Sequence, residues 1–131
     1  MRRAALVGAT LLSLVAGGAC APPAQDEVTI RFHYSHFQPD RVRVRAGHST
    51  TITLRNDDPI DHEWILGSPA IHEVHRHGTE AVHASRPTEV TVPALSTRVT
   101  TMTFSQPGEL AYICHLPGHE EYGMVGTLRV S

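Results

Sequence analysis

Apolar and polar residues alternate over most of the chain from about residue 27 onward, and a period of two is typical of strands with one buried face. In the first such segment, Val28, Ile30 and Phe32 alternate with polar residues. Similar segments, separated by turn signals rich in Pro, Gly, Asn and Asp, lie at 41–45, 51–55, 62–66, 89–92, 99–104, 110–114 and 125–130. Seven to eight short strands of this kind predict an all-β domain, a Greek-key β-sandwich, although the sequence does not give the strand order.

Residues 67–88 interrupt this pattern and show no clear period. We expect a helical turn near 71–75 within an otherwise irregular excursion, because Gly and Pro recur through it. Excursions of this length are commonly functional or mobile. Four histidines lie in it, and we interpret them as solvated, with an additional, more exposed metal site as the alternative: His72, His75, His77 and His83.

The first 20 residues differ in character from the rest. Arg2 and Arg3 precede an apolar run over 4–16, which is too short to span a bilayer and is typical of an export signal. We therefore predict a signal over 1–20, a linker over 21–26 and one domain over 27–131. This places the protein outside the cytoplasm, in a bacterial periplasm or at the cell surface.

Small residues leading up to Cys20 resemble a bacterial lipoprotein signal, in which Cys20 would carry lipid and become the new N-terminus. Gly17 stands where such signals usually have Leu, and ordinary cleavage near Ala19 or Ala21 is the alternative. Under the first interpretation the protein contacts the membrane only through this lipid.

Charge and cysteine content narrow the function. Without Arg2 and Arg3 the chain has nine Arg and no Lys against thirteen Asp and Glu, a formal charge of −4, and so offers no basic face for nucleic acid. If Cys20 is lipidated or removed, Cys114 is the sole thiol of an exported domain, where cysteines are usually paired. A Cys20–Cys114 disulfide or an inert buried thiol would leave the residues downstream of Cys114 unexplained.

Those residues supply further metal-binding groups at regular spacing. Cys114, His119 and Met124 are separated by four residues each time. Thiolate and thioether favour copper, imidazole suits copper in both oxidation states, and zinc has little use for Met. The blue-copper pattern of two His, one Cys and a distant axial Met needs a second histidine, and His62, which follows a turn and begins a strand, is the best candidate. We interpret His33, His36 and His48 as solvated.

The segment Cys-His-Leu-Pro-Gly-His at 114–119, followed by Met124 and a terminal strand, resembles the copper loop of cupredoxins such as plastocyanin, azurin and rusticyanin. The resemblance covers roughly 27–131. It implies a Greek-key β-sandwich with one copper ion, His62, Cys114 and His119 as equatorial ligands and Met124 as the axial ligand. It also implies single-electron transfer between larger redox proteins.

Two features depart from that family. Many members have Asn directly after the upstream histidine, where this chain has Glu63, and the excursion over 67–88 is not part of the minimal fold. Enzymatic function as part of a multicopper oxidase is disfavoured, since residue 113 is Ile where those oxidases carry the first His of a His-Cys-His triplet. A binuclear copper site would need two cysteines in the loop.

We therefore expect a non-enzymatic, monomeric electron carrier with a transient redox partner, which would dock around His119 on an apolar patch of Leu116, Pro117 and Tyr122. The alternative is a protein that binds or handles copper for resistance or for delivery to an oxidase, which the four histidines of the excursion favour.

Overall fold

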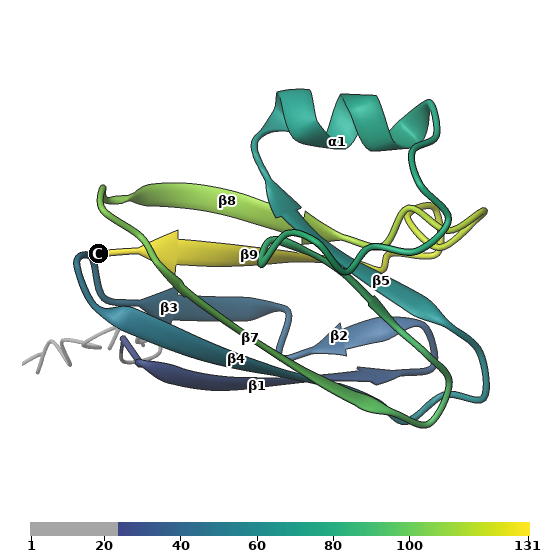
Figure 1. Cartoon of the computed structure of the whole chain (residues 1–131), viewed down its shortest axis with the longest axis horizontal. Coiled ribbons are helices and arrows are strands. Elements are labelled where there is room, and N and C mark those ends of the chain that lie inside the picture. Colours follow the sequence, from purple (N-terminus) through teal and green to yellow (C-terminus); the bar gives the residue numbers. More distant parts are fainter. Residues whose placement is uncertain (1–23) are drawn as a thin grey trace, which may run out of the picture.

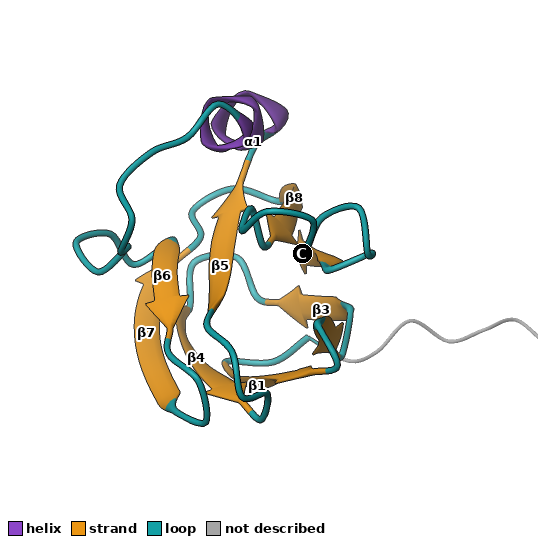
Figure 2. Cartoon of the chain, turned by 90° about the vertical axis from the view of Figure 1, so that its right-hand side faces the viewer, coloured by secondary structure: helices purple, strands orange, loops and turns teal. Residues whose placement is uncertain are grey.

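The computed structural model describes residues 24–131, which form two sheets packed face to face (Figures 1 and 2). The four-stranded sheet has the order β2-β1-β4-β7, and the five-stranded sheet has the order β3-β9-β8-β5-β6. Nine strands lie in this part of the chain: β1 (Glu27–His33), β2 (His36–Gln38), β3 (Arg41–Val44), β4 (Ser49–Asn56), β5 (His62–Gly67), β6 (Glu89–Val92), β7 (Thr97–Thr103), β8 (Gly108–Ile113) and β9 (Val125–Val130). The predicted all-β sandwich is confirmed.

Alternation explains most of these strands. β1, β3, β4 and β9 place every second side chain in the core between the sheets. β1 pairs in parallel with β4, and β3 in parallel with β9, while the other pairs are antiparallel. One strand, β2, was not among those predicted, because its three residues are too few to show a period. The largest wholly buried side chains are Trp64, Tyr112 and Phe32.

β5 is buried on both faces, although alternation predicted that only His62, Trp64 and Leu66 would face inward. The reason is the excursion after it, which begins with helix α1 (Pro69–Arg76) and lies over the outer face of the five-stranded sheet (Figures 1 and 2). Pro69 begins the helix with a φ angle that suits its first position. The expected helical turn is thus two full turns, and none of the described helices is long and apolar enough to cross a membrane.

The antiparallel pairing of β5 with β8 positions the site. Ile65 lies opposite Ile113, so the start of β5 lies beside the end of β8. His62 and Cys114, which are 52 positions apart in sequence, therefore meet at the same end of the sheet. The loop between β8 and β9 begins at this end (Figure 1).

Candidate metal centre

Three of the four residues predicted as metal ligands come together at this end of the sandwich. His62 Nδ1 lies 3.1 Å from His119 Nδ1, and His119 Nδ1 lies 3.2 Å from Cys114 Sγ. One ligand atom from each residue lies within 4.8 Å of the others. His62 and Cys114 are wholly buried and His119 is partly exposed, so the cluster sits just beneath the surface.

His62 is held by a carboxylate on the side away from this cluster. Its Nε2 lies 2.8 Å from Asp58 Oδ2. Since an ionised carboxylate only accepts, Nε2 carries the hydrogen and Nδ1 presents its lone pair to Cys114 and His119. A metal-binding histidine is commonly oriented in this way by a carboxylate.

Asp58 is in turn fixed as an anion. Burial alone would raise the pKa of Asp58, but the backbone N–H groups of Ser35 and Tyr34, together with the His62 ring, outweigh burial and lower it.

Asn56 holds the same turn in place. Its Oδ1 accepts from the Asp58 N–H, and its Nδ2 donates to the carbonyls of Ile60 and Val92. The rigid turn therefore sets the position of His62 before any metal binds.

Cys114 lies in surroundings that suit a metal-bound thiolate and not a free one. Burial raises the pKa of the Cys114 thiol to about 11, despite the hydrogen bond that its Sγ accepts from the backbone N–H of Glu63 at 3.3 Å. A cation is thus needed to form the thiolate at neutral pH. A sulfur donor and two imidazoles form a set that copper prefers, so these residues fit the predicted copper ion.

The loop that carries His119 is closed by its own backbone. Gly118 has a φ of +83°, a conformation that side chains disfavour, and His119 N–H donates to the Leu116 carbonyl. Met124 N–H donates to the His119 carbonyl, and Cys114 N–H donates to the Met124 carbonyl. Burial lowers the pKa of His119, and the neighbouring His62 lowers it further, so its ring is neutral and able to bind metal.

Met124 is wholly buried in the same core cluster as Cys114. Its backbone hydrogen bonds to Cys114 and His119 place its main chain beside the site. Its role as a ligand stays a prediction, as do the ligand roles of His62, Cys114 and His119.

Sequence reasoning did not find two polar residues with buried side chains, one that contacts the site and one that follows Cys114. Asp58, which orients His62, lies in the turn before His62, and a carboxylate four residues before a candidate ligand was a usable signal. His115 was passed over although it follows Cys114. Its side chain is 3% exposed, its Nε2 lies 3.0 Å from His72 Nδ1, and burial lowers its pKa to about 4.

The interpretation of the excursion as a solvated, histidine-rich segment is wrong for three of its four histidines. His72, His75 and His83 are buried, and only His77 is exposed. The amphipathic helix α1 turns its His72 and His75 face toward the sheet, so these rings lie under the helix. Of the other histidines expected to be solvated, His36 and His48 are exposed and His33 is partly buried.

The fold and this cluster define a small β-sandwich protein with a mixed sulfur and imidazole metal site. The sequence profile of the family described as copper binding proteins, plastocyanin/azurin family, matches residues 24–131. The chain therefore belongs to the plastocyanin/azurin family of copper-binding proteins, and its cofactor is copper.

Individual proteins give the same picture. The chain is 33% identical over 98 residues to the copper-resistant cuproprotein CopI of Rubrivivax gelatinosus. The aligned region covers 72% of this chain and 59% of that protein. It is 26% identical over 144 residues to the copper-resistant cuproprotein CopI of Pseudomonas aeruginosa, and the aligned region covers 86% of this chain and 80% of that protein. The chain thus spans about three fifths of the first relative.

A reduced auracyanin from Roseiflexus castenholzii has the same fold, with a TM-score of 0.71 and 17% identity over 83% of this chain and 99% of that one. Both the predicted family and the predicted cofactor are confirmed.

Proposed function

We propose that this protein holds one copper ion at His62, Cys114, His119 and Met124 and transfers single electrons between extracytoplasmic redox partners. The observation that supports the proposal most is the convergence of His62, Cys114 and His119 from two strands and one closed loop. Copper bound there would change between Cu(I) and Cu(II) by one electron.

The residues of the chain keep such a site rigid and dry. Asp58 fixes the tautomer and direction of His62, and the Glu63 N–H fixes the direction of Cys114 Sγ. Cys114 and Met124 are wholly buried, so water does not reach the sulfur atoms. A site that does not rearrange when its charge changes suits electron transfer better than it suits substrate binding, and this favours a non-enzymatic role.

A partner would dock where His119 approaches the surface. Tyr122 is 75% exposed and Val125 is 39% exposed, while Leu116 is partly buried and Pro117 is exposed. A small apolar patch of this kind suits a transient complex, which releases its partner after one electron has passed. In this proposal the protein is a monomer in the bacterial periplasm or at the cell surface, and lipid on Cys20 attaches it to the membrane. The residues over 1–20 lie outside the described part of the chain.

The second candidate function is copper handling, by binding copper for resistance or delivery. Two observations favour it: the relatives named copper-resistant cuproproteins, and the histidines that line up beside the copper loop. A handling protein would exchange copper with a chelator or partner quickly, whereas an electron carrier would retain it through many redox cycles.

The deciding experiment is a visible absorption spectrum of the purified protein with Cu(II), beside Cys114→Ser and the control His48→Gln, an exposed histidine. We expect an intense thiolate-to-copper band near ~600 nm in the protein and the control but not in Cys114→Ser. Copper bound without this band would overturn the electron-carrier proposal. With the band present, repeated reduction and oxidation against a competing chelator separates the two functions.

A further inference from the structure

A second group of metal-binding side chains lies between the excursion and the start of β6. His75 on helix α1, His83 in the segment after it and Glu89 at the start of β6 place one ligand atom each within 4.8 Å of the others. His75 Nε2 and His83 Nδ1 both lie 3.7 Å from Glu89 Oε2. The three side chains are at most 6% exposed, and they come from three separate segments.

The free nitrogen of His75 points into this group. His75 Nδ1 lies 2.9 Å from the backbone carbonyl of Ile71, which can only accept, so Nδ1 carries the ring hydrogen of the neutral imidazole. Nε2 then has a lone pair directed at Glu89 and makes no hydrogen bond. This is the tautomer that binds a metal through Nε2.

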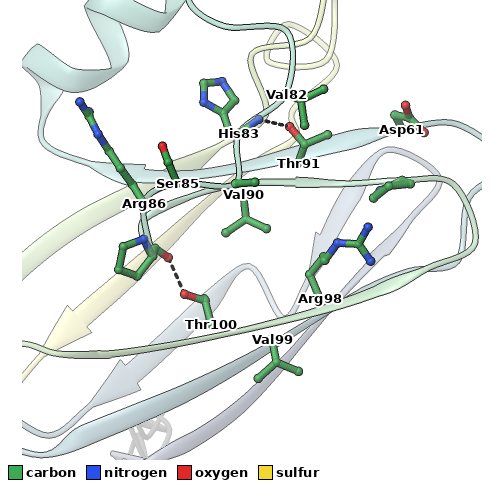
Figure 3. Close-up of a pocket in the computed structure, with 13 residues that line it drawn as sticks. Asp61, Val82, His83, Ser85, Arg86, Val90, Thr91, Arg98, Val99 and Thr100 are labelled. Atoms are coloured by element: carbon green, nitrogen blue, oxygen red, sulfur yellow. Dashed lines mark hydrogen bonds between the residues drawn. The ribbon is translucent and has the colours of Figure 1, made fainter.

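His83 and Glu89 are held in a corresponding way. The backbone N–H of His83 donates to Thr91 Oγ1 at 2.8 Å, and its ring nitrogen Nε2 lies 3.2 Å from Thr79 Oγ1, on the side away from Glu89. Figure 3 shows the imidazole of His83 directed away from the hollow that Val90 and Thr100 line. Arg86 binds Glu89 Oε1 at 2.9 Å, which leaves Oε2 for the group.

His83 Nδ1 also makes no hydrogen bond, although it is buried. Two unpaired imidazole nitrogens and a carboxylate oxygen thus face one another out of contact with water. Burying polar atoms without partners costs free energy, and a cation among them removes that cost. Ligand atoms around a tetrahedral ion with bonds of 2.0–2.2 Å lie ~3.4 Å apart. Each imidazole nitrogen lies 3.7 Å from Glu89 Oε2, close to that separation.

We propose that His75, His83 and Glu89 form a second metal site, for a divalent cation that favours imidazole, Zn²⁺ or Cu²⁺. Glu80 Oε1 lies 3.4 Å from His83 Nδ1, so this exposed carboxylate is available to complete the coordination from the solvent side. The site has no sulfur, so it disfavours Cu(I) and is chemically distinct from the site at Cys114. It does not depend on the electron-carrier proposal.

The test separates the two sites by oxidation state. The full chain is loaded with Cu(I) under a reductant, so that the Cys114 site is filled, and is then titrated with Zn²⁺ by calorimetry. Zinc per chain is counted after gel filtration. We expect one zinc per chain, and at least ~10-fold weaker binding in His83→Gln and in Glu89→Gln. His77→Gln is the matched control, because His77 is exposed on the same helix and should bind zinc as the parent does.

Zinc-edge X-ray absorption of the parent protein keeps the test decisive if a variant does not fold. Two imidazole nitrogens with oxygen ligands support the site, and a sulfur ligand overturns it. Absence of zinc binding, or unchanged binding in both variants, also overturns it. In the oxidised protein, a second paramagnetic Cu²⁺ signal that is lost in His83→Gln would assign copper and not zinc. The ~600 nm band reports the Cys114 site independently.

Discussion

Asp58 Oδ2 accepts a hydrogen bond of 2.8 Å from His62 Nε2, and this contact determines which nitrogen of His62 faces Cys114. Both residues are buried. The carboxylate is itself held by the backbone N–H groups of Tyr34 and Ser35, which belong to the opposite sheet's β1–β2 turn. The ligand position is therefore tied to both sheets, and loss of the carboxylate should weaken metal binding without unfolding the domain.

The first prediction concerns Asp58→Asn. We expect copper affinity to fall ~10–100-fold, because the amide cannot hold the His62 ring as the carboxylate does, while the thiolate-to-copper band remains. Competition with a chelator measures the affinity. Asp57→Asn is the control, since the Asp57 carboxylate binds Arg31 and Arg55 and does not contact His62. Equal losses of affinity in the two variants would show that Asp58 has no particular role.

The second prediction distinguishes an axial ligand from a core side chain at Met124. Met124→Leu conserves volume, so the metal-free protein should lose less than ~1.5 kcal/mol of stability. If the thioether donates to copper, its removal leaves three ligands, which suit Cu(I) but give the more electron-poor Cu(II) one donor fewer. The reduction potential should therefore rise. Redox titration followed at the thiolate band measures it. An unchanged potential would assign Met124 to packing alone.

The third prediction concerns Gly126, where β9 passes under the ring of Tyr112. A Cβ at this position would overlap the buried Tyr112 ring, which is fixed by its hydrogen bond to the Pro39 carbonyl. Gly126→Ala should therefore lower the free energy of unfolding by ~1–3 kcal/mol or more. Gly108→Ala, at the exposed start of β8, has nothing within 4 Å and should change it by less than ~0.5 kcal/mol. Urea denaturation of the metal-free protein checks both.

The sequence predicted the fold well because the sheets are amphipathic. In β4, Ile52 and Leu54 face the core and Thr51 and Thr53 do not, so period and burial agree. The proximity of Cys114 and His119 was predictable because both lie on one short segment. His62 reaches this segment only because β5 pairs with β8. The sequence does not give that pairing, and it indicated His62 only by its position at the start of a strand.

The excursion was not predictable because its burial arises from tertiary packing. In the sequence, His75 and His83 are polar residues of an irregular segment. In the structure, His75 lies on the buried face of helix α1, and His83 is buried beside it and Glu89 of β6. Glu63 was identified as a departure from the family, and its carboxylate lies 3.6 Å from His83 Nε2 while its N–H bonds Cys114. One residue thus touches both groups of metal-binding side chains, and burial raises the pKa of its carboxyl.

The last prediction concerns pH. Burial lowers the pKa of His72 despite its hydrogen bond from Nε2 to the Ala111 carbonyl, and its Nδ1 accepts from His115 Nε2 at 3.0 Å. Protonation of His72 Nδ1 would break the bond to His115.

Because the folded-state pKa of His72 lies below that of the unfolded chain, the unfolded chain binds more protons below about pH 6.5, the usual value for His. The free energy of unfolding of the metal-free protein should therefore fall as the pH drops below that value. Removing this histidine should make the fall shallower in His72→Gln than in the parent. His77→Gln, exposed on the same helix, should not make it shallower. Urea denaturation at a series of pH values, with a chelator present, measures the free energy of unfolding. If it falls with pH equally steeply in His72→Gln and in the parent, His72 binds its proton equally well in the folded and unfolded states, and the prediction is wrong.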